Sequence, residues 1–317
     1  MIDFRYLLVT VVSIFLALTV GITLGAGFLG DPLSRDLKRR IESVTGIVGD
    51  QRSEIGELND QIDEGGDWAQ SIEPWVVDGR LAGRDIVLFT IDGSDEAVID
   101  GTREILDLAD ADIVTEINVG QKFALPSEPE ATQLATIVDS VADERRALVG
   151  QTADALGEGA ASLAADDDVG VDGAAVTVTE YDGLLRLLEE QDFISMSQAA
   201  EETAPIPPGA SFVVAGGNSS PEPFDTSAFV ERLTIGLAGR DLSVVVSEST
   251  GSSWELARTI RESGDAGALA SSVDVGDNAR GRVALVLALD RNEGDPPGHF
   301  GIGDGTQPLP DPRPDDG

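Results

Sequence analysis

The first apolar stretch of the chain runs from Tyr6 to Leu29 without a charged residue. At about 1.5 Å per residue, a helix over this stretch is roughly 36 Å long, which exceeds a hydrocarbon core of about 30 Å. It lacks the polar stripe that a core helix of a soluble protein shows. A cleaved signal peptide is the alternative, but its apolar region usually has about 7–15 residues. The pattern therefore predicts an uncleaved transmembrane anchor over residues 1–30.

A heptad pattern over residues 31–66 predicts a short coiled-coil stalk after the anchor. Apolar residues recur there at alternating spacings of three and four, with Gln51 at one polar position. The predicted seam consists of Ile41, Val44, Val48, Ile55, Leu58 and Ile62. A single amphipathic helix that packs on its own domain is the alternative. Within the anchor, Gly21 and Gly25 have the G-x-x-x-G spacing that lets two membrane helices approach closely, so we expect a homo-oligomer.

From Gly66 onward the heptad pattern gives way to alternating strand and helix patterns, which are typical of an α/β fold. A compact apolar run at 85–90, a helical pattern at 95–110 and a second strand pattern at 112–119 indicate a βαβ unit with a parallel sheet. Further helices are predicted over 131–148 and 183–191. The Gly- and Ala-rich stretch between these two helices is typical of a loop, with a short strand at 175–179. Residues 67–201 are therefore predicted to form a first lobe.

A second α/β pattern begins after the proline-rich linker at 202–210. Its predicted strands are 211–215, 242–247 and 269–273, and its predicted helices are 226–237, 253–262 and 277–290. The sequence Leu-Ala-Gly-Arg-Asp, at 81–85 and again at 237–241, precedes a predicted strand in each half. The interpretation is a second lobe over 202–292, with both lobes Rossmann-like or flavodoxin-like. Residues 293–317 are rich in Gly, Pro and Asp, and are predicted to be a mobile tail.

Acidic residues dominate the charge of the chain. It has 21 Lys and Arg against 58 Asp and Glu, a formal charge of −37. Residues 1–40 carry five cations and three anions, so the remaining chain carries −39. Such a body is repelled by nucleic acid, which excludes that class of partner. Such a body also attracts cations diffusely, but solubility or a high-salt habitat explains the charge better than a specific cation-binding role does.

Residues that carry chemistry are sparse. The chain has no cysteine, which excludes disulfides, thiolate metal sites and cysteine nucleophiles. No P-loop, no G-x-G-x-x-G after a strand and no G-x-S-x-G elbow occurs. His299 is the one histidine, and a catalytic triad would have to use it from the predicted tail. We therefore expect neither an enzyme nor a bound cofactor.

Several stretches together resemble the mycobacterial copper transport protein B family (MctB). They are FRYLLVTVVSIFLALTVGITLGAGFLGDPL at the start, LAGRDIVLFT in the first lobe, and NARGRVALVLALDRN, GHFGIGDG and LPDP near the end. The resemblance implies an envelope protein that acts in copper efflux or tolerance, with copper as the transported ion. It supplies no copper ligands to carry over. His299, within GHFG, matches the terminal motif and is the one residue proposed as a metal ligand.

The sequence leaves two alternatives for the side of the membrane on which the soluble body lies, and two for its function. Arg35, Lys38, Arg39 and Arg40 follow the anchor, and the positive-inside rule would place the body in the cytoplasm. The resemblance implies the opposite side, which we adopt because folding of the segment behind a short flank can overrule its charge. The membrane contact itself is assigned to residues 6–29. The alternative function is an oligomeric envelope scaffold without a metal role, which the shortage of metal ligands favours.

Overall fold

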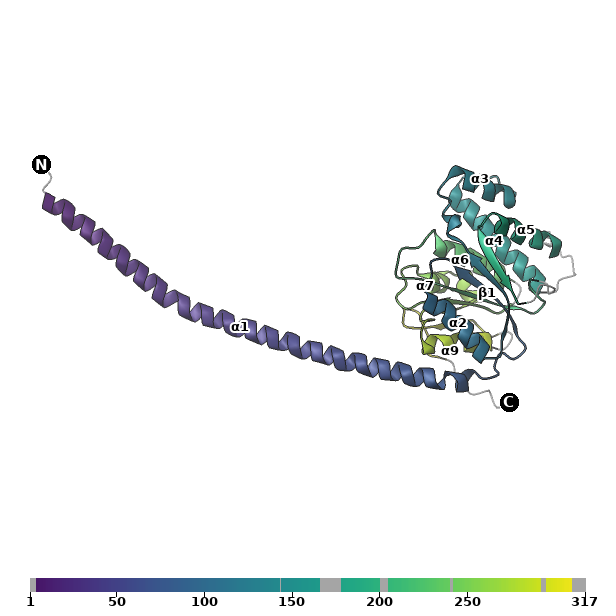
Figure 1. The fold of residues 1–317 in the computed structure, drawn as a ribbon, viewed down its shortest axis with the longest axis horizontal. Helices are drawn as coiled ribbons and strands as arrows, with labels where there is room; N and C mark the ends of the chain where they lie inside the picture. Colours follow the sequence, from purple (N-terminus) through teal and green to yellow (C-terminus); the bar gives the residue numbers. More distant parts are fainter. Residues whose placement is uncertain are drawn as a thin grey trace. The chain divides into compact units, whose positions relative to one another are not determined.

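A computed structural model describes residues 4–142, 144–165, 178–199, 205–239, 242–291 and 295–309. The chain forms two compact units, Met1–Gly65 and Gly66–Gly317. Helix α1 (Phe4–Val77) makes up the described part of the first unit and continues into the second (Figure 1).

The amino-terminal part of α1 is the membrane candidate. Of the described residues, one helical segment, Phe4–Gly25, is long and apolar enough to cross a membrane, with a mean hydropathy of 2.6. Its hydroxyl side chains bond to the carbonyl oxygen four residues earlier, at 2.7–2.9 Å, so they need no water in an apolar environment. These side chains are Thr10, Ser13, Thr19 and Thr23.

The second unit is built on one seven-stranded sheet with the order β3-β2-β1-β4-β5-β6-β7. Strand β3 is antiparallel to β2, and every other neighbouring pair is parallel. The strands are β1 (Asp85–Ile91), β2 (Asp112–Val119), β3 (Ile194–Gln198), β4 (Ser211–Gly216), β5 (Val244–Glu248), β6 (Ser271–Val273) and β7 (His299–Phe300).

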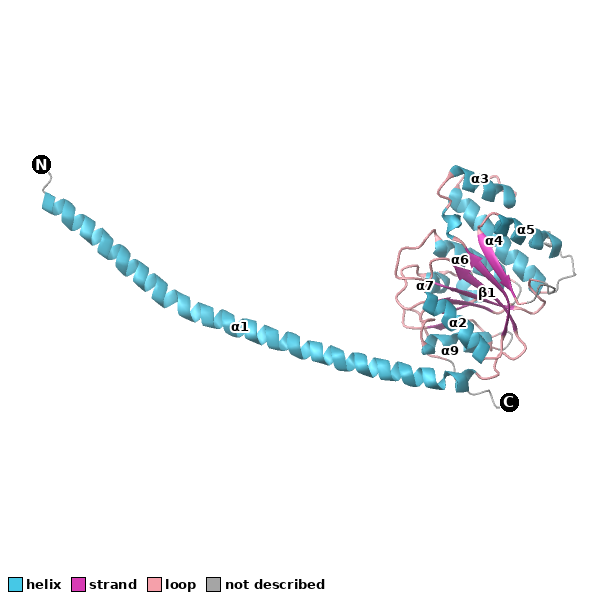
Figure 2. Cartoon of the chain, viewed as in Figure 1, coloured by secondary structure: helices cyan, strands magenta, loops and turns pink. Residues whose placement is uncertain are grey.

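Helices cover both faces of the sheet (Figure 2). On β1, Val87 and Phe89 pack against one helical layer, whereas Ile86 and Leu88 pack against the other. This alternation explains why the strands are apolar at nearly every position. The first layer contains α3 (Glu128–Ile137), α4 (Arg145–Ala164), α5 (Val178–Glu190), α6 (Thr226–Ala238), α7 (Leu256–Glu262) and the short α8 (Ala266–Leu269). The second contains α2 (Glu96–Leu108), α9 (Ala279–Leu289) and the end of α1; the 3-10 helix η1 (Gln121–Ala124) follows β2.

The predicted α/β class is confirmed, but the division into two lobes is not. The sequence predicts β1 and β4 in different lobes, yet they pair in parallel from Ile86 with Ser211 to Thr90 with Ala215. Both halves of the sequence therefore contribute to the same sheet and to the same two apolar layers.

The region around α4 differs most from the sequence prediction. The predicted helix at 131–148 is two helices, α3 and the start of α4, and the predicted loop from Gly157 is helical up to Ala164. The glycine that suggested a loop instead allows close packing of α4 on α6. A Cβ at Gly157 would lie 2.5 Å from the carbonyl oxygen of Leu233. The predicted strand at 175–179 falls partly outside the described residues, and α5 begins at Val178.

Part of the predicted mobile tail belongs to the sheet. Strand β7 pairs with β6, with Ser272 opposite His299 and Val273 opposite Phe300. Phe300 is 2% exposed and packs in the same apolar layer as α9. Burial of Phe300 thus holds β7 at the edge of the sheet, which the Gly-rich composition of this segment does not predict.

Candidate functional site

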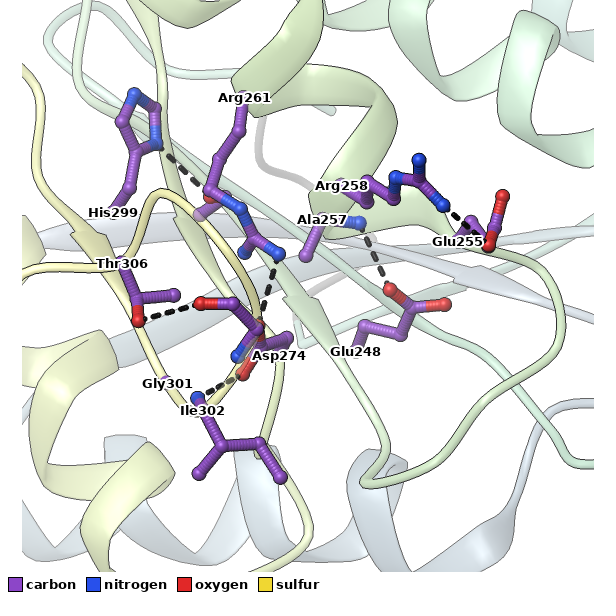
Figure 3. A network of polar contacts seen from close by, with 12 residues as sticks. Glu248, Glu255, Ala257, Arg258, Arg261, Asp274, His299, Gly301, Ile302 and Thr306 are labelled. Carbon is purple, nitrogen blue, oxygen red and sulfur yellow. Dashed lines mark hydrogen bonds and ion pairs between the residues drawn. The ribbon is translucent and has the colours of Figure 1, made fainter.

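The candidate site lies where the chain leaves the ends of β5, β6 and β7. Parallel strands end at a common edge, and open α/β sheets bind ligands at the carboxyl-terminal edge. Glu248 is the last residue of β5, and Asp274 follows β6. Figure 3 shows these two carboxylates together with Arg261 of α7 and His299 of β7, with a contact of Glu248 to Ala257 and a separate ion pair of Arg261 with Asp274. The site therefore contains two largely buried acids, a largely buried arginine and the histidine of the chain.

Glu248 is a buried carboxylate whose hydrogen bonds leave one oxygen, Oε1, without a partner among the described atoms. Glu248 is 3% exposed, and Oε2 accepts from the backbone N–H of Ala257 at 2.9 Å. Burial raises the pKa of Glu248, and the negative charge of Asp274 adds to this, while the hydrogen bonds from Ser252 and α7 act against it.

Asp274 and Arg261 form a buried ion pair beside Glu248. Arg261 Nη2 lies 2.9 Å from Asp274 Oδ2, and the two side chains are 7% and 13% exposed. The same carboxylate accepts the backbone N–H groups of Ile302 at 2.8 Å and Gly303 at 3.0 Å. Because each of its oxygens is bonded, Asp274 holds the loop after β7 in place.

His299 is half-buried, and both of its ring nitrogens are engaged. Nδ1 lies 2.9 Å from the hydroxyl of Ser272, and Nε2 lies 3.2 Å from the carbonyl oxygen of Gly267. A carbonyl can only accept, so the neutral ring carries its proton on Nε2 and accepts from Ser272 at Nδ1. Burial lowers the pKa of His299, and the charges of Arg261 and Arg291 lower it further, against the hydrogen bond to Gly267. A copper ion would have to displace one of these partners.

We expect replacement of His299 by glutamine to flatten the pH dependence of stability near neutrality. The lowered folded-state pKa means that the unfolded chain binds a proton more readily. The stabilisation is therefore complete above the unfolded pKa of about 6.5 and is lost as pH falls below that value through the lower folded-state pKa. Melting temperatures from pH 7.5 to 5.5 should fall more in the wild type than in His299→Gln. Equal slopes for the two proteins would contradict the expectation.

The described residues offer little for holding a metal ion. Within the described ranges, no three His, Asp or Glu side chains are grouped closely enough to form a metal site. Asp274 is balanced by Arg261 and by backbone donors, whereas Oε1 of Glu248 and Nε and Nη1 of Arg261 have no hydrogen-bond partner among the described atoms. The described part of the site therefore offers a single unpartnered carboxylate oxygen rather than a ligand set for a tight copper site.

The family comparison covers the whole described chain. A model of the family described as "Copper transport outer membrane protein, MctB" matches residues 1–310. The chain belongs to the MctB family. The resemblance inferred from the sequence motifs is thereby confirmed, and the match includes the apolar helix, the heptad segment and all seven strands.

Named MctB relatives agree in length with this chain. It is 28% identical to the copper transporter MctB of Mycobacterium bovis, over 98% of this chain and 99% of that relative. The same identity and coverage hold for the copper transporters MctB of two strains of Mycobacterium tuberculosis. A copper-transport family and a candidate membrane helix together support a membrane or envelope protein.

The other predicted site residues of this MctB member lie in the first unit. A Cβ placed at Gly21 or Gly25 would meet nothing within 4 Å, so the single chain leaves both positions open. The seam side chains are 39–69% exposed in the single chain. They are Ile41, Val44, Val48, Ile55, Leu58 and Ile62. The coiled coil, which needs a second chain, therefore stays a prediction.

Glu248 and Asp274 were missed by the sequence analysis, although a signal for both was available. Each acid directly follows a predicted apolar strand, at 242–247 and 269–273. An acid at that position, immediately after a strand of a predicted parallel sheet, marks the edge where polar groups converge. Arg261 had no comparable signal, because its approach to Asp274 depends on how α7 packs beside β6.

Proposed function

We propose that this MctB member is a single-pass envelope protein that takes part in copper export and tolerance without catalysing a reaction. The observation that carries the proposal is the family match over residues 1–310. The apolar segment Phe4–Gly25 supports membrane attachment by one helix. The acidic α/β unit is proposed to face away from the cytoplasm.

The charge of the body suggests how copper is handled. The chain carries a formal charge of −37, and the described residues form no compact group of three metal-binding side chains. A strongly negative surface raises the local concentration of cations without binding each of them tightly. We infer that the acidic body concentrates copper near the membrane and that the conducting path is formed by an oligomer or by a partner protein.

Deletion of the gene tests the copper role. We expect the deletion strain to tolerate less copper and to contain more cell-associated copper, and the full chain to restore both. Copper titration of the purified His299→Ala protein is the second test, because His299 is the single proposed ligand. A tenfold weaker copper affinity of that protein would support direct binding, and unchanged affinity would remove His299 as a ligand. Unchanged tolerance of the deletion strain would favour the scaffold function instead.

Protease treatment of intact cells tests the proposed orientation. If the body lies outside the cytoplasm, the protease should cut the chain beyond the anchor without lysis. Protection of the body until the cells are lysed would place it in the cytoplasm, as the cations at 35–40 suggest.

The exposed seam supports oligomerisation, and Ile55→Asp with Leu58→Asp is the variant that tests it. These side chains are 57% and 51% exposed in the single chain. Burying each of them in a coiled coil contributes about 1.5–3 kcal/mol, so two charges in the seam should reduce the cross-linked oligomer by at least tenfold. Ser53→Asp adds a charge at a non-seam position and is the matched control. Equal cross-linking of both variants would favour the single amphipathic helix.

A further inference from the structure

We infer that the second unit binds a small organic carboxylate with a flat apolar body, in a pocket distinct from the polar site described above. The pocket has a volume of about 320 Å³ and is lined by residues of η1, α4, α6 and the segment before α6. This volume lies at the lower end of the range for small-molecule pockets, about 300–1,000 Å³. The inference is independent of the copper role.

Three mutually contacting phenylalanines line the pocket. The ring centroids of Phe123 lie 5.8 Å from Phe224 and 5.2 Å from Phe229, and the rings of Phe224 and Phe229 meet edge to face. All three side chains are at least nine-tenths buried, and Val149 and Pro223 extend the apolar lining. Phe224 is 9% exposed and Phe123 and Phe229 are 1% exposed, so a flat ring in the pocket would pack mainly against Phe224, which the other two rings hold in place. The aromatic lining therefore selects a flat apolar ligand.

Arginines dominate the polar part of the lining. Arg145, Arg146 and Arg232 line the pocket, against one acidic residue, Asp225. Arg146 pairs with Asp225 at 2.9 Å, whereas Arg145 and Arg232 pair with Glu128 and Asp154, whose side chains are not part of the lining. A guanidinium is planar and binds a carboxylate through two parallel hydrogen bonds, so the rim selects an anion, and a carboxylate matches its geometry.

The ion pairs of these arginines leave donors for a ligand. Arg232 contacts Asp154 through Nε at 3.1 Å and Nη2 at 3.0 Å, and the two side chains are 47% and 36% exposed. Pairs this exposed contribute only about 0–1 kcal/mol, so the guanidinium remains able to bind another carboxylate. A Cβ at Gly150 would lie 2.5 Å from Nη1 of Arg232, so the glycine leaves room for this third nitrogen beside the pocket.

Binding of 2-naphthoate to the full chain in lipid nanodiscs tests the pocket. The probe joins a flat apolar ring system to one carboxylate, and 2-naphthamide is its neutral counterpart. Saturation-transfer NMR, corrected with empty nanodiscs, should show naphthoate binding that is at least tenfold tighter than naphthamide binding. Arg232→Gln should weaken naphthoate binding about tenfold, the loss expected for a hydrogen bond to a charged group.

Asp154→Asn is the matched control for Arg232→Gln, because it removes the same ion pair but keeps the guanidinium. Its affinity for naphthoate should equal or exceed that of the wild type. If Arg232→Gln lowers the melting temperature, Arg145→Gln provides a second variant on the half-exposed rim. Equal affinities for naphthoate and naphthamide would overturn the proposal and indicate an apolar docking site for a protein side chain. Equal losses in Arg232→Gln and Asp154→Asn, or no binding by the folded chain, would also overturn it.

Discussion

Replacement of Glu73 by alanine is expected to destabilise the second unit by about 3–5 kcal/mol. Glu73 lies near the end of α1 and is 3% exposed. Its two oxygens accept from Arg282 of α9, at 2.8 Å from Nε and 2.7 Å from Nη2. Without the carboxylate, the guanidinium, which is 12% exposed, keeps its charge in the interior without a counter-ion. The cost therefore exceeds that of losing a surface ion pair.

Thermal unfolding of the full chain in nanodiscs measures this loss. For a unit of this size, each 1 kcal/mol shifts the melting temperature by about 2–4 °C, so a decrease of roughly 6–20 °C is expected. Glu262→Ala is the control, because it breaks an ion pair with Arg258 of similar length, 2.8 Å, on the surface. It should cost less than about 1 kcal/mol. Equal shifts for the two variants would show that the buried pair contributes nothing beyond a surface pair.

Replacement of Gly281 by alanine should destabilise the protein by about 3 kcal/mol or more. An added Cβ would lie 1.8 Å from the carbonyl oxygen of Val275 and 2.4 Å from its carbonyl carbon. Both are backbone atoms of the connection between β6 and α9, so no side-chain rotation relieves the overlap. The backbone N–H of Gly281 also donates to the capping side chain of Asn278 at 3.1 Å. Relief of the overlap would therefore disturb the start of α9.

Gly183→Ala is the matched control for the loss of a helical glycine. Gly183 lies inside α5, and a Cβ there would meet nothing within 4 Å. Alanine favours a helix by about 0.8–1 kcal/mol over glycine, so this variant should be slightly stabilised. The midpoint of urea unfolding should thus move in opposite directions in the two variants. A shift of the same sign and size in both would contradict the proposed backbone overlap.

The regular elements of the sheet were predictable because their signals are local. The apolar run 85–90 and the helical spacing of 95–110 correspond to β1 and α2, within two residues at each boundary. By contrast, α4 was partly assigned to a loop, since its glycines are unfavourable for an isolated helix. Contact with α6 reverses that preference, because close packing needs a residue without a side chain at Gly157. Tertiary packing, rather than propensity, made this segment helical.

The candidate sites were less predictable than the elements that carry them. His299 stood out as the one histidine, but its two hydrogen bonds come from β6 and from Gly267 of α8. The buried pair of Arg261 and Asp274 likewise depends on the packing of a helix beside a strand. Sequence spacing does not report such contacts, because they form only when the sheet assembles.

The sequence by itself determined the apolar helix, the heptad segment, the acidic charge and the α/β class, since each depends on residue type or short-range periodicity. Only the tertiary structure decided that β1 and β4 join both halves in one sheet and that residues near the carboxyl end supply β7. It also brought Phe123 and Arg232 into the lining of one pocket. Parallel strands must be joined by long crossovers, so pairing partners lie far apart in sequence and local patterns do not specify them.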